Sequence, residues 1–425
     1  MRNGGWGASR AAALLLAIGL VAGLGAAPAG AAVPPPTDPG TPGVTATTIR
    51  VGGVAARTGA DGRVYEHALA GARAYFDLVN RSGGVGGRRI RLVATAGDAG
   101  DPARDVASVR ELVERRGVFA VLPVATPSFA AAGYLATNAV PTFGWTAPGG
   151  ATTAWSAGPT LFGDAGSYEC LTCARLPAAF VAHEVGATRV AVVAGPTPGA
   201  AACARGLQAA FARYGPPVEL VDSGATAGAN DAQKLHDLRV DFVAMCGDVG
   251  AAARLADALR GAGTQDAHLF VTDGYAPAAA RRLGASLDGV YTATGFLPVD
   301  PASKVPGMRQ FVAAMKAVHV AADEQALAGW LNAALFVAGL RAAGAEPTRA
   351  RVVDAINAMT DDTADGILPG LDWSAAGHGP ARTGCSAYVE VVKGAYVARF
   401  GQPGKPFVCF PQYPDPATVD APTYR

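Results

Sequence analysis

Several residue groups in this chain have the types and spacing of reactive or metal-binding sites. Cys170 and Cys173 form a C-x-x-C pair, a spacing that suits a redox disulfide or half of a zinc site. The second close Cys or His pair that a zinc site needs is missing from the sequence, so we expect no metal. Asp98, Asp101 and Asp105 also resemble a metal cluster, but they surround the start of a predicted helix, whose positive end they would stabilise.

Motifs for catalysis or nucleotide binding are absent or incomplete in the sequence. G-x-S-x-G, G-x-x-x-x-G-K-[ST] and H-E-x-x-H do not occur. The stretch Gly195–Gly199 follows a predicted strand, but it lacks the G-x-G-x-x-G spacing and its prolines remove two N–H donors. We therefore expect neither an enzyme nor a bound cofactor.

Small polar residues instead follow the predicted strands of the first half of the chain. These segments are Ala56–Gly59, Pro123–Ser128 and Gly144–Pro148, after strands predicted at Ile49–Val54, Val118–Leu122 and Val140–Phe143. The carboxyl ends of parallel strands meet at one edge of a sheet, where ligands bind in open α/β folds. Hydroxyl and backbone N–H groups should therefore gather at that edge.

The alternation of strand and helix restarts in the second half. Strands are predicted at Arg189–Ala194, Val218–Val221, Asp241–Met245 and His268–Val271, with loops at Gly195–Gly199, Gly247–Gly250 and Thr272–Tyr275 at their carboxyl ends. Helices are expected at Val305–Val318 and Ala326–Ala343, and a hairpin at Tyr388–Phe400 with a turn at Lys393-Gly394. The pattern predicts an α/β protein with two Rossmann-like lobes.

The N-terminal segment of the chain indicates export. Met1–Ala32 has two arginines, an apolar stretch and a run of small residues, which is the layout of a secretory signal peptide, although a retained membrane anchor is the alternative. Residues 33–44 are rich in Pro and Gly and are expected to form a flexible leader. Because the first cysteine is Cys170, no lipobox cysteine follows the apolar stretch. We expect a secreted, extracellular or cell-envelope protein.

The net charge limits the classes of binding partner, and the number of cysteines predicts disulfides. Loss of Arg2 and Arg10 with the signal peptide changes the formal charge of the chain from +1 to −1. Because nucleic acids and anionic membranes are bound by basic surfaces, we expect neither as a partner. An even number of cysteines in an exported protein predicts disulfides, for which the candidates are Cys170, Cys173, Cys203, Cys246, Cys385 and Cys409. We favour a Cys385–Cys409 pair, because both residues flank the predicted hairpin.

One segment of the sequence also resembles the pattern of a known protein family. The stretch VNRSGGVGGRRIRLVATAGDAGDPARDVASVRELVERRGVFAVLP, at 79–123, resembles the same region of the leucine/isoleucine/valine-binding proteins, the type I periplasmic or extracellular substrate-binding proteins of ABC transporters. The resemblance extends loosely from Ile49 to about Val397. It implies two lobes joined by a three-strand hinge. Lobe one is expected at 45–165 plus 295–368 and lobe two at 166–294 plus 369–412, with a C-terminal tail at 413–425.

The resemblance also implies a ligand site between the lobes. In the family, lobe one holds a carboxylate through hydroxyls and backbone N–H groups, while an acid and aromatics on lobe two meet the ammonium group and the side chain. The positions of lobe one that match are Thr126, Ser128, Thr146 and Ala147. Asp273 lies at or beside the family's acid. For each residue the alternative is an ordinary turn role.

This chain departs from the family pattern in lobe two. The loops Gly195–Gly199 and Gly247–Gly250 lack the tyrosines of amino-acid binders and carry Pro198 and Asp248 instead. Other residues that could line the site are Arg57, Thr58, Tyr65, Trp145, Tyr168 and Tyr275. Trp145 or Tyr275 could stack on a flat or quaternary-ammonium ligand, or could serve core or hinge packing.

We therefore predict an exported, monomeric solute-binding protein that closes over a small polar ligand and offers it to an ABC permease. The ligand could be an amino acid, an amide, a urea-like compound or an aromatic compound. The alternatives are a secreted ligand-sensing module that signals to a receptor, and an extracellular thiol or hydrolytic enzyme that uses Cys170 and Cys173.

Overall fold

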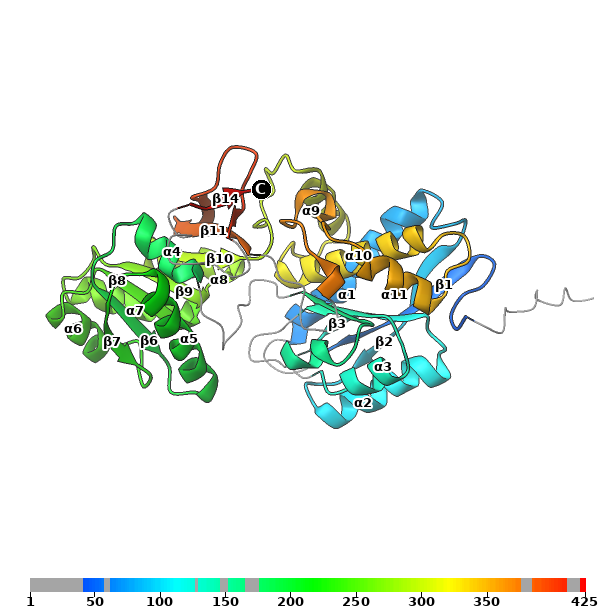
Figure 1. Cartoon of the computed structure of the whole chain (residues 1–425), viewed down its shortest axis with the longest axis horizontal. Helices are drawn as coiled ribbons and strands as arrows, with labels where there is room; N and C mark the ends of the chain where they lie inside the picture. The colour runs from blue at the N-terminus through cyan, green and yellow to red at the C-terminus, as the bar shows by residue number, and fades with distance from the viewer. Residues whose placement is uncertain are drawn as a thin grey trace, which may run out of the picture. The chain divides into compact units, whose positions relative to one another are not determined.

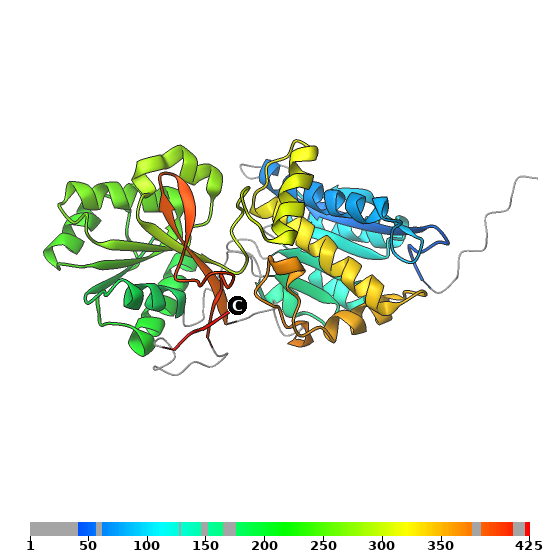
Figure 2. The same cartoon turned by 90° about the horizontal axis from the view of Figure 1, so that it is seen from above.

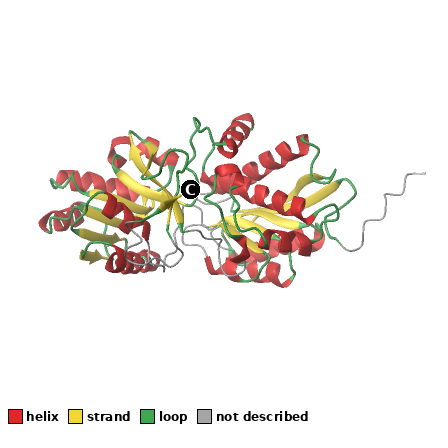
Figure 3. Cartoon of the chain, turned by 45° about the horizontal axis from the view of Figure 1, so that its top comes forward, coloured by secondary structure: helices red, strands yellow, loops and turns green. Residues whose placement is uncertain are grey.

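The computed structural model describes residues 41–56, 62–126, 129–145, 152–164, 176–375, 384–410 and 421–425. Within these ranges the chain forms two lobes, each a largely parallel sheet flanked by helices (Figure 3). The signal peptide predicted at 1–32 lies outside the described residues.

The first sheet is parallel throughout and has the strand order β2-β1-β3-β4-β5. Its strands are β1 Thr48–Ala55, β2 Arg89–Gly97, β3 Ala120–Ala125, β4 Thr142–Trp145 and β5 Leu161–Asp164. Strand β3 lies in the middle and is buried along its whole length, as its continuous apolar sequence predicted. Strand β5 was not predicted, because four residues carry too little periodicity.

Helices cover both faces of the first sheet (Figure 1). On one face lie α1 Gly62–Arg81, α10 Glu324–Ala343 and α11 Arg349–Asn357, and on the other lie α2 Pro102–Arg110 and α3 Ala132–Thr137. A π-helical turn, η1 Glu111–Arg115, continues α2. Asp101 caps α2 by accepting a hydrogen bond from the Arg104 N–H at 2.9 Å, which confirms the expected start of this helix. Helix α9 Pro306–Ala317 also packs into the core beside α1.

The second sheet has the order β14-β13-β11-β10-β9-β8-β6-β7, and β12 pairs with β11. Its strands are β6 Val190–Ala194, β7 Val218–Asp222, β8 Phe242–Asp248, β9 His268–Asp273, β10 Val290–Thr294, β11 Cys385–Val392, β12 Ala395–Arg399, β13 Val408–Cys409 and β14 Thr423–Tyr424. Strands β6 to β10 are parallel, whereas β11 to β14 pair antiparallel. The expected hairpin is thus β11 and β12.

The second sheet is also buried on both faces. Side chains alternate along β6, where Val190 and Val192 join one core and Ala191 and Val193 join the other. The first core is completed by α4 Leu176–Glu184 and α5 Pro198–Tyr214, and the second by α6 Ala229–Asp237, α7 Val249–Gly261 and α8 Pro277–Leu283. This is the same layered plan as in the first lobe.

The chain passes between the two sheets three times: between β5 and α4, between β10 and α9, and between residue 375 and β11. Strand β10 Val290–Thr294 belongs to the second sheet, and the chain leaves that sheet after it. Within the expected tail at 413–425, Thr423 and Tyr424 pair with β13 as β14.

Among the described residues, two disulfides join distant segments. Cys385 and Cys409 face each other in the β11–β13 register and are bonded, which confirms the pairing favoured from the sequence. Cys203 of α5 is bonded to Cys246 of β8. Cys170 and Cys173 lie outside the described residues.

Two glycines allow α1 and α10 to lie side by side (Figures 1 and 2). A Cβ atom on Gly71 of α1 would overlap with the Ala326 carbonyl oxygen of α10, and one on Gly329 of α10 would overlap with the Ala68 carbonyl oxygen of α1. The two backbones therefore touch. Among the described residues, α10 is the helix long and apolar enough to cross a membrane, but 72% of its apolar window is buried inside the protein. Its composition is that of a core helix.

We expect Gly329→Ala to lower the unfolding free energy by at least about 2 kcal/mol, because the added methyl group pushes the two helices apart. Gly261→Ala is the matched control: Gly261 is also helical, and a Cβ there meets no atom within 4 Å. The control should be neutral or stabilising by up to about 1 kcal/mol. Urea unfolding measures both, and equal stabilities of the two variants would contradict the close contact.

Candidate ligand-binding site

The predicted lobe-one residues that the structure describes lie at the carboxyl edge of the first sheet. Strands β1 and β3 are neighbours, and the Ala56 N–H after β1 donates to the Ala125 carbonyl oxygen of β3 at 3.0 Å. Thr126 follows β3, and Trp145 ends β4. Tyr65, in the first turns of α1, packs on a small cluster with Ala55 and Ala125. The edge thus brings three predicted positions together.

Other predicted residues lie outside the described part of the chain: Arg57, Thr58, Ser128, Thr146, Ala147 and Tyr168. The backbone of Trp145 is described, whereas its side chain is not. These six residues, and the Trp145 ring, remain predictions.

Thr126 is held from behind by a buried acid. Its hydroxyl donates to Asp98 Oδ2, while Asp98 Oδ1 accepts the Gly100 N–H at 3.1 Å. Asp98 is fully buried, and Thr126 is nearly so. The bond to Asp98 therefore fixes the Thr126 side chain directly after β3.

A second buried acid supports the next part of the same loop. Asp105 of α2 is fully buried, and its Oδ2 accepts the Ala131 N–H at 2.9 Å. Its other oxygen, Oδ1, has no hydrogen-bond partner among the described residues. Burial, with a smaller contribution from the Asp98 charge, raises the pKa of Asp105 to about 6, against the lowering effect of the Ala131 hydrogen bond. Asp98 and Asp105 thus support the edge, and within the described ranges no three His, Cys, Asp or Glu side chains are grouped to hold a metal ion.

The two predicted acids of lobe two are neighbours at the carboxyl edge of the second sheet. Asp248 and Asp273 end β8 and β9 and face each other in the parallel register. Asp248 is exposed and caps α7, with Oδ1 accepting the Ala251 N–H at 2.8 Å. Asp273 is half-buried. Asp248 thus caps α7 and also brings a charge to this edge.

Tyr275 is a hinge residue in the structure. Its ring is 5% exposed and packs against Phe296 and Tyr396, and its hydroxyl accepts the Val299 N–H at 2.7 Å. Phe296 and Val299 lie in the second connection between the lobes. This burial does not support the hypothesis that Tyr275 stacks on a ligand and favours the alternative of hinge packing.

Tyr396 of β12 is a supporting residue that the sequence did not reveal. Its hydroxyl donates to the Gly274 carbonyl oxygen and accepts the Ala276 N–H at 2.9 Å. Burial raises the pKa of Tyr396 to about 12, with smaller contributions from Glu324 and Asp273, so the phenol stays protonated and can donate. The loop after Asp273 is therefore fixed from a strand 120 residues away in sequence.

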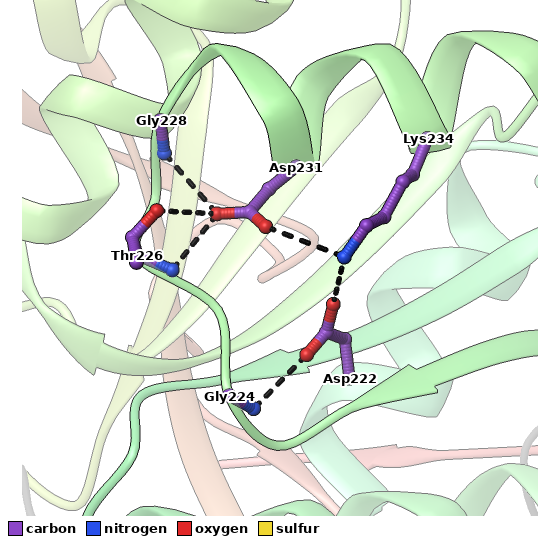
Figure 4. A network of polar contacts seen from close by, with 6 residues as sticks. All are labelled: Asp222, Gly224, Thr226, Gly228, Asp231 and Lys234. Atoms are coloured by element: carbon purple, nitrogen blue, oxygen red, sulfur yellow. Dashed lines mark hydrogen bonds and ion pairs between the residues drawn. The ribbon is translucent and has the colours of Figure 1, made fainter.

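A polar network shapes the loop that follows β7 (Figure 4). Asp231 Oδ2 accepts the Thr226 N–H at 2.8 Å and the Gly228 N–H at 3.3 Å, and Lys234 Nζ pairs with Asp222 Oδ2 at 3.0 Å. The Gly224 N–H and then Lys234 hold the pKa of Asp222 below its usual range. Because these groups satisfy one another, the network serves the loop's conformation.

A cavity lies at the amino edge of the second sheet, opposite the edge that carries Asp248 and Asp273. It has a volume of about 460 Å³ and is lined by residues at the amino ends of β9 and β10, among them His268, Asp288 and Val290. Arg260, Gln265 and Glu390 also reach it. It is thus separate from Asp248 and Asp273.

We expect Asp105→Asn to change how stability depends on pH. A folded pKa near 6, above the unfolded value of 3.8, means that the wild type loses stability as pH rises from 3.8 to 6, by up to about 3 kcal/mol. Asp105→Asn should remove this loss. Asp101→Asn, an exposed cap on the same helix, should keep it. Urea unfolding between pH 4.5 and 7 gives the slopes, and identical slopes for all three proteins would contradict the assignment.

Comparison with known proteins supports a single family. A family model described as periplasmic binding protein matches residues 48–395. A search among curated proteins gave no match.

Solved structures share the fold at low sequence identity. A substrate-binding periplasmic protein of Ralstonia solanacearum has a TM-score of 0.62 and 22% identity, covering 83% of this chain and 100% of its own. A branched-chain amino acid transporter substrate-binding protein of Streptococcus pneumoniae, in complex with isoleucine, has a TM-score of 0.64 and 17% identity, with coverages of 84% and 100%. A solute-binding protein of R. palustris, in complex with benzoate, has a TM-score of 0.62 and 17% identity, with coverages of 83% and 95%.

The match to the family model covers most of the chain and includes residues of both lobes. This protein belongs to the periplasmic binding protein family.

Proposed function

We propose that this protein captures a small polar solute, an amino acid or a related compound, between the carboxyl edges of its two sheets and delivers it to an ABC permease. Family membership supports a binding role outside the cytoplasm. Two sheets with parallel strands, joined by three connections, suit a hinge that closes over a solute. A solute that contacts both edges would favour the closed form, because only that form offers both sets of contacts.

The positions of four aspartates are the main support for the proposed class of solute. Asp98 and Asp105 lie behind the edge of the first sheet, and Asp248 and Asp273 end two neighbouring strands of the second. Negative charge at both edges favours a solute with a positive group over one that is only an anion. A zwitterion fits, since backbone N–H groups at the strand ends could hold its carboxylate by their dipoles.

In this proposal Asp273 binds the ammonium group. It is half-buried, so its charge is less screened by water than that of exposed Asp248. Tyr396 fixes the backbone directly after it. A fixed, half-buried carboxylate is suited to a specific charge-assisted hydrogen bond.

The structural relatives suggest the panel that tests this choice, since one holds isoleucine and another holds benzoate. We expect the oxidised chain 33–425 to be stabilised by L-isoleucine or another amino acid, by about 2.7 kcal/mol at 100 times the dissociation constant. Thermal shift and calorimetric titration measure this, and the solute should be recovered unchanged. Binding of benzoate but of no amino acid would contradict the proposed solute class.

Asp273→Asn should weaken the binding of the amino acid at least tenfold, roughly the loss of one charge-assisted hydrogen bond. Asp288→Asn is the matched control, because Asp288 belongs to the amino edge of the same lobe, where its Oδ1 accepts the Lys393 N–H at 2.6 Å. The control should bind like the wild type. Equal affinities of the two variants would remove Asp273 from the site.

A further inference from the structure

Helix α10 contains one residue that does not fit its surroundings. The structure describes the whole helix, and among its buried residues Asn332 is the one with a polar side-chain amide. It is 5% exposed, and its neighbours in the core are Leu331, Ala333 and Phe336. An apolar residue of similar size could fill this position with no polar atoms to satisfy.

The amide of Asn332 is only half satisfied. Its Nδ2 donates to the Gly144 carbonyl oxygen at 3.3 Å, across 188 residues of sequence. Its Oδ1 has no hydrogen-bond partner among the residues that the structure describes. A buried acceptor without a partner destabilises the folded state. Stability alone therefore does not explain why asparagine stands here.

The partner of Asn332 lies at the carboxyl end of β4. Gly144 pairs with Val124 of β3 on one side and with Gly163 of β5 on the other. On the sheet face opposite α10, a Cβ on Gly144 would collide with the ring of Trp155. The end of β4 is thus held between an indole ring on one face and the Asn332 amide on the other.

We propose that Asn332 is a positioning residue for solute binding: it fixes the carbonyl of Gly144 and so the end of β4 at the carboxyl edge. The inference rests on the proposed function. Residues that break a local rule at a cost in stability are expected where function requires them. Strand ends that present backbone groups to a solute need this kind of support from the surrounding core.

A second asparagine provides the matched control. Asn357 of α11 also has an Oδ1 without a hydrogen-bond partner in the described ranges, and its Nδ2 donates to the Pro159 carbonyl oxygen at 3.2 Å. Pro159 precedes β5, so this contact supports the amino edge of the same sheet. The two residues share the amide chemistry, whereas Asn357 is less buried than Asn332 and supports the other edge of the sheet.

The experiment compares Asn332→Leu and Asn357→Leu in the oxidised chain 33–425. We expect Asn332→Leu to melt at the same temperature as the wild type or higher, since it removes the unsatisfied oxygen. Its amides at 142–145 should exchange hydrogen faster, and its dissociation constant for L-isoleucine, or for the panel member that binds, should rise about tenfold. Asn357→Leu should leave the dissociation constant unchanged. Asn332→Ala, which adds no volume, replaces the leucine variant if that protein does not fold.

An unchanged dissociation constant in a stable Asn332 variant would overturn the proposal. So would a loss of affinity that Asn357→Leu shows to the same extent, because that would be a general effect on the sheet. If the wild type binds no member of the panel, the proposed function fails. The exchange rates at 142–145 then still decide whether Asn332 positions β4, and unchanged rates would overturn that role.

Discussion

Parallel pairing of strands is the constraint on which the rest of this structure depends. In a parallel sheet the carboxyl ends of all strands lie at the same edge, so residues that are far apart in sequence lie close together there. In the first lobe this brings Ala56, Thr126 and Trp145 to one edge. In the second lobe it sets Asp248 opposite Asp273. The position of a binding site follows from this pairing before any side-chain detail is considered.

The segments that follow the strands are not held by the hydrogen bonds of a sheet, so other contacts must fix their conformation. Buried side chains supply it from remote parts of the chain: Asp98 holds Thr126, Asp105 holds the N–H of Ala131, and Tyr396 holds the backbone at 274 and 276. Each contact places a polar group in the core, where it must be satisfied or lowers stability. Asp105 Oδ1 and Asn332 Oδ1 have no hydrogen-bond partner among the described residues, so this requirement is met incompletely in the lobe-one core.

Much of the fold could be predicted from the sequence, because its signals are local. The predicted strands and helices and the acids at the start of α2 indicated the α/β alternation, and the two cysteines that flank the hairpin indicated the Cys385–Cys409 pair. Short strands such as β5, β13 and β14 could not be found, because their pairing partners define them and their own residues do not.

The site was less predictable for the same reason. That Thr126 and Asp273 end strands was visible locally, whereas the burial of Tyr275 in the hinge depends on Phe296 and Tyr396. Within the run Ala326–Leu340 of α10, Asn332 is the one polar side chain, which is a local signal in the sequence. Its meaning appears only when the fold places it beside Gly144.

The most direct test of the central claim is hydrogen exchange of the oxidised chain with and without L-isoleucine, or the panel solute that binds. The account predicts that the solute protects the carboxyl edges of both sheets, in peptides covering 120–126 and 142–145 and in peptides covering 246–250 and 272–276. Protection confined to the amino edge of the second sheet, at 264–269 and 288–291 around the cavity there, would contradict it.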